Sequence, residues 1–128
     1  MESLLETLKA LSDKTRLRIL LLLPGHELCL GQIMATLELS PSTVSKHVSV
    51  LKSTGLVTDR KSGKWVYCSL SGNPEGTPQE LFSLIAREIS KSPEVIEDRR
   101  KLQKILEIPP ETLCERFRTR NRIGRTII

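Results

Sequence analysis

The fold is decided by the stretch LSPSTVSKHVSVLKSTG, residues Leu39–Gly55. Ser40 is a favoured N-cap residue, and Pro41 follows at the first helical position, where its missing N–H costs nothing. Gly55 suits the left-handed conformation that often ends a helix. Apolar residues recur at helical spacing between these signals: Val44, Val48 and Leu51. The stretch therefore predicts one amphipathic helix with a narrow buried face.

The opposite face of this helix carries only small hydroxyl side chains and lysines. Its members are Ser42, Lys46, Ser49 and Ser53, with Thr43, Ser45 and Lys52 on the flanks. Such side chains can reach phosphates and base edges in the major groove of DNA, and nothing bulky blocks the approach. The same composition also suits an ordinary solvated face, so the surrounding segments must decide between the two interpretations.

The segments before this helix complete a helix-turn-helix. Leucines at helical spacing predict a first helix that ends near Ser12, and Asp13 can cap a second helix over residues 14–23. A short apolar-periodic segment, residues 28–37, then leads through a tight turn at Leu39 and Ser40 into the central helix. Two helices joined in this way are typical of a helix-turn-helix.

The segment after the helix changes period and predicts a basic hairpin. Residues 56–70, LVTDRKSGKWVYCSL, indicate two strands around a turn at residues 61–64, with Cys68 on the buried side. A basic hairpin directly after a helix-turn-helix is a wing that can touch the DNA backbone or minor groove. We therefore favour DNA binding, and the candidate contacts are Ser40, Ser42, Thr43, Ser45, Lys46, His47, Lys52, Arg60, Lys61 and Lys64.

The rest of the chain predicts further helices. After a loop, a helix is expected over residues 78–90, another from Pro93 to about Ile108, and a last short one over residues 111–117. An arginine-rich tail follows. We therefore expect a winged helix-turn-helix domain with dimerisation helices over residues 1–91, and a helical extension with a basic tail over residues 92–128. The fold class is mostly α with a small β-hairpin, in a dimeric winged helix-turn-helix.

Composition narrows the class of protein. The 128 residues suit one domain with extensions, and the net charge of +5 favours a polyanionic partner. A chain of this size has a modest core, so pairing of two copies would help to bury its amphipathic helices. No apolar run is long enough to span a membrane, and the acidic N-terminus is unlike a secretory signal. Three widely spaced cysteines do not indicate a disulfide framework, so we expect a reducing cytoplasm.

Four segments, in order, resemble the ArsR-type (ArsR/SmtB) winged-helix repressors: LKALSDKTRLRILLLL, ELCLGQI, LSPSTVSKHVSVLKSTGLV and KSGKWVYCSL. The resemblance covers about residues 4–89. It implies a homodimer paired through the first helix and the helix at residues 78–90, bound to twofold operator DNA. It also implies release of that double-stranded DNA by an inducer, often a metal or metalloid ion.

The sensing motif departs from the family patterns. The arsenic-sensing pattern is similar to ELCVCDL, whereas this chain has ELCLGQI at residues 27–33, with Cys29 at the first thiolate position and Gly31 at the second. One thiolate cannot close a trigonal As(III) site. The zinc-sensing pattern needs histidine on the dimer helix, and residues 78–90 contain Glu80 and Glu88 but no histidine.

The three cysteines are not equally good candidates for metal ligands. Cys29 is expected near a helix N-terminus, where the helix dipole can lower a thiol pKa, although it could equally be a small packing residue. Cys68 is expected to be a buried core thiol. Cys114 follows the shared pattern, and with Cys29 it is the candidate metal site, for As(III) or another thiophilic ion. Packing beside Leu113 is the alternative for Cys114.

The sequence bears on three classes of function. The chain shows no phosphate-binding glycine loop, no catalytic Cys/His setting and no evident carboxylate pair, so we do not expect an enzyme. A DNA-binding repressor released by a thiophilic ion is the favoured function, without a certain cofactor. A repressor of the same type without metal sensing, under thiol-redox, small-molecule or expression-level control, remains the alternative.

Overall fold

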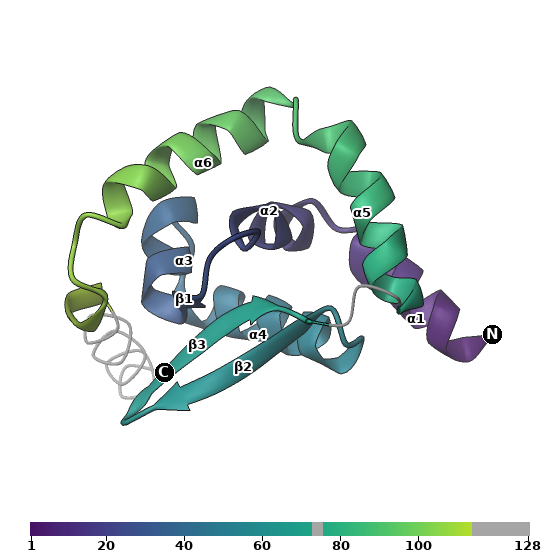
Figure 1. Ribbon diagram of the computed structural model, residues 1–128, viewed down its shortest axis with the longest axis horizontal. Helices are drawn as coiled ribbons and strands as arrows, with labels where there is room; N and C mark the ends of the chain where they lie inside the picture. The colour runs from purple at the N-terminus through teal and green to yellow at the C-terminus, as the bar shows by residue number, and fades with distance from the viewer. Residues whose placement is uncertain (73–75, 114–128) are drawn as a thin grey trace.

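The computed structural model describes residues 1–72 and 76–113, which are mostly helical with one small antiparallel sheet (Figure 1). The elements in chain order are α1 (Glu2–Leu11), α2 (Lys14–Leu22), β1 (Leu28–Cys29), α3 (Leu30–Leu37), α4 (Pro41–Ser53), β2 (Val57–Ser62), β3 (Trp65–Leu70), α5 (Thr77–Ile89) and α6 (Pro93–Ile105). Residues 110–113 are also helical. Cys114 and the arginine-rich tail lie outside the described residues. No helix within the described ranges is long and apolar enough to cross a membrane.

Helices α3 and α4 form the predicted helix-turn-helix. The turn begins at Glu38, whose φ of 56° places it in the left-handed region, and the Leu39 N–H donates to the Met34 carbonyl at 3.2 Å. A left-handed residue at this position redirects the chain and satisfies a carbonyl at the end of α3. Ser40 then caps α4, and Gly55 after the helix has a positive φ of 81°, so the sequence signals for this helix are confirmed at both ends.

The core is aliphatic and lies where α2, α3 and α4 pack together. Val44, Val48 and Leu51 are buried, as their spacing predicted. Figure 1 shows α2 in the middle, with the sheet and α4 along one edge and α5 and α6 along the opposite edge. This arrangement leaves the outer side of α4 and the hairpin beside it open to a partner.

The wing is a three-stranded sheet rather than the two-stranded hairpin expected from the sequence. Its strand order is β1-β3-β2, and both pairings are antiparallel. Residues 28 and 29 were expected to begin a helical segment, but they form a short strand paired with Cys68 and Tyr67. As a result, the backbone of Cys29 lies in register with Tyr67, which in turn lies opposite Arg60.

Helix α6 packs against α2 and α3 and shares their core. Val95 and Leu102 are buried within the core cluster, and Leu113 beyond the helix is 1% exposed. Ser92 is the N-cap and Pro93 the first helical residue, as expected, although the helix ends at Ile105 rather than near Ile108. Helix α6 therefore adds apolar side chains to the core of the preceding segment. The domain boundary between residues 91 and 92 stays a prediction.

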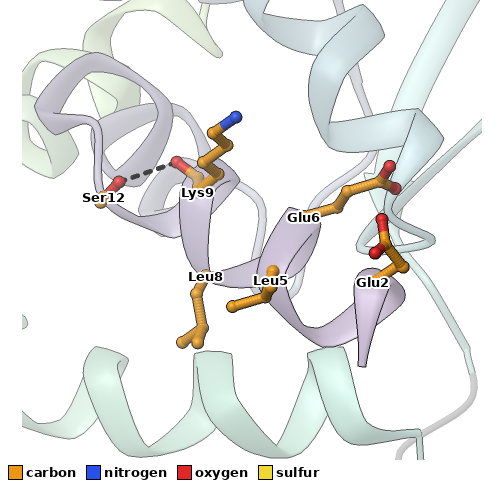
Figure 2. Close-up of a pocket in the computed structure, with 6 residues that line it drawn as sticks. All are labelled: Glu2, Leu5, Glu6, Leu8, Lys9 and Ser12. Atoms are coloured by element: carbon orange, nitrogen blue, oxygen red, sulfur yellow. Dashed lines mark hydrogen bonds between the residues drawn. The ribbon is translucent and has the colours of Figure 1, made fainter.

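Helices α1 and α5 contact one another and leave an apolar surface uncovered. We call it the α1–α5 surface and define it by its exposed side chains: Leu4, Leu5, Leu8 and Leu84. Figure 2 shows Leu5 and Leu8 on the side of α1 that faces α5, with Glu6 and Lys9 pointing away. They line a shallow depression, together with the charged side chains of α1 and Ser12. Of the predicted apolar residues of α5, only Phe82 is fully buried.

Candidate nucleic-acid interface

Helix α4 is fixed at its N-terminus by hydroxyl groups. The Oγ of Ser40 accepts a hydrogen bond from the Thr43 N–H at 3.2 Å and lies 2.8 Å from the Oγ1 of Thr43. Ser42 Oγ lies 3.3 Å from the same oxygen. Three of the predicted contacts therefore form one hydroxyl cluster at the positive end of the helix dipole, where phosphate oxygens are favoured.

The outward face of α4 keeps its predicted composition. Ser42, Lys46 and Ser49 are exposed, whereas Ser45 is half-buried. Because the apolar stripe of α4 faces the core, the opposite side chains point away from the protein. Lys46 makes no ion pair with any residue of the described ranges.

His47 lies toward the protein side of α4. Its Nδ1 is 3.3 Å from Nη1 of Arg16, and because a guanidinium can only donate, Nδ1 accepts here. Arg16 also donates from Nε to the Ala10 carbonyl at 2.9 Å and from Nη2 to the Lys9 carbonyl at 3.2 Å. This arginine thus links the end of α1 to α4, a role that sequence reasoning missed.

Lys52 forms an ion pair with another residue of the chain. Its Nζ lies 2.5 Å from an Asp59 carboxylate oxygen on β2, and this hydrogen bond raises the pKa of Lys52. The pair joins the last turn of α4 to the wing, which also contact each other through their backbones. Lys52 therefore holds the wing beside α4, in addition to its predicted role as a DNA contact.

The wing cations fall into two groups. Arg60 donates from Nε and Nη2 to the two carboxylate oxygens of Glu27, at 3.0 and 2.6 Å. Lys61 and Lys64 are exposed near the turn, and the Nζ of Lys64 lies 5.1 Å above the Trp65 ring centre. The turn itself contains Gly63, whose positive φ of 62° favours glycine. Lys61 and Lys64 are thus the better placed backbone contacts among the three predicted wing cations.

Cys29 is the N-cap of α3 and is buried. Its backbone N–H donates a hydrogen bond to the side-chain oxygen of Gln32 at 2.9 Å. Its Sγ lies 3.9 Å from the carbonyl oxygen of Pro110, so the segment after α6 returns to the start of the helix-turn-helix. Cys29 is disulfide-bonded in this structure.

Cys68 is a free, buried thiol, as its strand position predicted. Burial raises the pKa of Cys68 to about 11, with the nearby Asp59 carboxylate adding to the effect. The thiol therefore stays protonated at neutral pH, which disfavours a role as a thiolate ligand. Among the described residues, no group of three or more histidine, cysteine or acidic side chains could hold a metal ion.

Sequence reasoning missed the acidic partners of two predicted contacts, Arg60 and Lys52, and of Arg18 on α2. Glu27 precedes Arg60 by 33 residues, and Asp98 lies 80 residues beyond its partner Arg18. No local pattern marks such pairs, because only the folded sheet and the packing of α6 bring them together. Asp59 was nearer to Lys52 in the chain, but nothing in its strand position singled it out.

Comparison with known proteins places this geometry in a family. Residues 13–59 match the family described as bacterial regulatory protein, arsR family. The arsenic resistance transcriptional regulator ArsR2 of Pseudomonas putida is 42% identical over 71 residues, covering 55% of this chain and 60% of that protein. The transcriptional activator HlyU of Vibrio cholerae is 42% identical over 75 residues, covering 59% of this chain and 69% of that protein.

Solved structures agree with the sequence relatives. A structure of reduced HlyU from Vibrio cholerae has a TM-score of 0.58 and 33% identity, covering 68% of this chain and 88% of that one. A homodimeric winged helix-turn-helix DNA-binding domain from Mycobacterium bovis, a possible ArsR-family regulator, has a TM-score of 0.61 and 28% identity, covering 72% and 82%. The names of ArsR2 and HlyU describe them as transcriptional regulators, and the protein from Mycobacterium bovis is described as a possible one.

The match is centred on the helix-turn-helix and does not extend over whole relatives. The chain spans about 60% of the length of the first curated relatives that it matches. HlyU and its reduced structure are covered more fully, at 69% and 88%. With its capped α4, three-stranded wing and aliphatic core, the chain belongs to the ArsR family of bacterial regulatory proteins.

Proposed function

We propose that this protein is a transcriptional repressor that binds double-stranded operator DNA as a homodimer. Helix α4 enters the major groove, and the wing touches the adjacent backbone. The observation that carries the proposal is the surface of α4, where Ser42 and Lys46 are exposed on a helix that packs against strand β2 of the wing. Short hydroxyls and lysines suit contacts with phosphates and base edges.

The homodimer is supported by the α1–α5 surface. Leu84 is 59% exposed and Leu5 is 53% exposed, on two helices that contact each other. A twofold pair built on this surface would present two copies of α4 to a palindromic site. The relative from Mycobacterium bovis is described as homodimeric, which supports the same assembly here.

The experiment for DNA binding is selection of duplexes from a random pool by the full chain. We expect recovery of a site with two inverted half-sites, each protected in its major groove. The half-sites should be spaced by about one helical turn or a multiple of it, because each recognition helix reads one face of the duplex. Recovery of no preferred sequence, with equal affinity for every duplex tested, would rule out operator recognition.

We further propose that Cys29 receives the signal that releases the DNA. Cys29 caps α3, the first helix of the helix-turn-helix, and its sulfur faces the returning segment at Pro110. With Cys114 it would supply two thiolates to As(III) or another thiophilic ion, and a third would come from a small thiol or a second copy. A ligand that binds only the DNA-free shape shifts the population away from the DNA-bound one.

Thiol-redox control is a second candidate, because Cys29 is a disulfide cysteine in this structure. Two thiols that join as a disulfide give up two electrons and two protons, which would reduce one peroxide molecule to two waters. Oxidation and ion binding would then compete for the same sulfur. Arsenite titration of the reduced protein, with the selected duplex bound, distinguishes them: ion sensing requires release by arsenite, whereas pure redox control requires release by peroxide alone.

A further inference from the structure

Arg60 is held by two neighbours in the DNA-free protein. Its guanidinium makes the two-point contact with Glu27, and its Cζ lies 5.5 Å from the centre of the Tyr67 ring. The contact lowers the pKa of Glu27 and raises that of Arg60, which are the shifts expected when each charge stabilises the other. Exposed ion pairs are usually weak, but a two-point contact together with a ring contact restrains an arginine more than a single hydrogen bond does.

This restraint matters for DNA, because a phosphate must compete with the Glu27 carboxylate for the same guanidinium. Glu27 occupies two of the five N–H donors of Arg60 and neutralises its charge. An approaching phosphate also meets the negative charge of Glu27 itself. Lys61 and Lys64, by contrast, form no ion pair within the described ranges.

We propose that Glu27 is a positioning residue that holds Arg60 away from the DNA backbone and so limits sequence-independent binding. The inference rests on the proposed DNA-binding function and names a determinant of its specificity. Glu27 stands two residues before Cys29, and Cys29 shares one row of the sheet with Tyr67 and Arg60. The restrained arginine therefore lies on the same sheet as the proposed signal-receiving residue.

The test is the salt dependence of binding to a duplex of random sequence. Each phosphate that a protein neutralises contributes about −0.9 to the slope of log affinity against log salt concentration. Glu27→Gln should make that slope more negative by up to about one unit, so its gain in affinity shrinks roughly threefold between about 50 and 200 mM salt. A loss of fold alone would not steepen the slope.

The chain offers a matched control in the Arg100–Glu97 pair of α6. That pair has the same two-point geometry, at 2.9 and 2.6 Å, and similar exposure. Glu97→Gln removes the same charge as Glu27→Gln, and we expect it to leave the slope unchanged. Arg60→Gln should abolish the steepening in the Glu27→Gln background, because no guanidinium is then left for Glu27→Gln to release.

Two results would overturn the inference. One is a slope that Glu27→Gln and Glu97→Gln change equally, because the effect would then come from net charge alone. The other is a flattening of about one unit by Arg60→Gln in the wild type, because Arg60 would then already contact a phosphate. Either result leaves the proposed function standing, whereas loss of preference for the selected duplex in the wild type would remove the function itself.

Discussion

Arg18 on α2 and Asp98 on α6 form a two-point ion pair, in which Nε donates to Oδ2 and Nη2 to Oδ1, each at 2.8 Å. The Asp98 side chain is only 4% exposed, and the hydrogen bond to Asp98 raises the pKa of Arg18. Arg99 adds a hydrogen bond from Nε to the Leu21 carbonyl at 3.0 Å. These contacts fasten α6 to the helix that precedes the DNA-binding motif.

Breaking this pair from one side should destabilise the protein strongly. Arg18→Ala leaves the buried Asp98 carboxylate without its partner, and we expect a loss of about 3 kcal/mol in the free energy of unfolding. The double variant Arg18→Met with Asp98→Leu should lose less than Arg18→Ala, because no buried charge remains unpaired. Urea denaturation measures both. A double variant at least as unstable as the single one would contradict this account.

The N-cap of α2 predicts a pH-dependent contribution to stability. Asp13 accepts a hydrogen bond from the Arg16 N–H at 3.0 Å, and this bond is the main cause that lowers the pKa of Asp13 below 3.8. A lowered pKa means that the folded state favours the charged carboxylate. The stabilisation is therefore complete above pH 3.8 and is lost as the pH falls through the lower folded value.

Asp13→Ala should cost about 0.5–2 kcal/mol at neutral pH, as removal of an N-cap does. The difference in unfolding free energy between the wild type and this variant should shrink as the pH falls below 3.8. Asp13→Asn is the control, because asparagine caps a helix without titrating. A difference that stays constant from neutral to acidic pH would show that the charge of Asp13 does not contribute.

The sequence predicted the parts of the fold that local chemistry determines. Ser40 and Pro41 mark the start of α4, and the period of Val44 and Val48 marks its buried face, so that helix was found correctly. Strand β1 was missed because two residues carry no period and their hydrogen-bond partners lie almost forty positions away. The ion pair between Arg60 and Glu27 was missed for the same reason, because the two residues are 33 positions apart. The sequence around an exposed arginine does not show whether that arginine is paired.

Lys46 and Lys64 should affect DNA binding in different ways. If Lys46 reads a base, Lys46→Ala should weaken binding to the selected duplex by roughly 1–3 kcal/mol and reduce discrimination at one position. Lys64→Ala should weaken binding to all duplexes alike, because a wing lysine meets phosphates. Lys104→Ala on α6 removes the same charge away from this surface and serves as the control. Fluorescence anisotropy measures all three, and unchanged affinity in the first two variants would exclude this docking.

The α1–α5 surface predicts the assembly state. Leu84→Glu places a charge on this surface, so light scattering should report the mass of one 14.4 kDa chain instead of two. Ile96→Glu is the matched control, because Ile96 on α6 is 57% exposed, close to the 59% of Leu84, and lies outside the α1–α5 surface. A wild-type mass of one chain at micromolar concentration, or a dimer lost equally in both variants, would contradict pairing through these helices.

Substitution of Cys29 should abolish the release of DNA by the inducer. Cys29→Ser removes the only thiol at the position that the arsenic-sensing pattern shares, so DNA release by arsenite or peroxide should be lost while affinity for the selected duplex is kept. Serine is also a favoured N-cap residue, so the start of α3 should stay intact.

Cys114→Ser should weaken the same response, whereas Cys68→Ser should leave it unchanged, because the raised pKa of Cys68 keeps that thiol protonated. Anisotropy of a bound duplex during titration measures each variant. If the wild type releases DNA with neither reagent, or Cys29→Ser responds as the parent does, control through this thiol is excluded and a thiol-independent repressor becomes the better hypothesis.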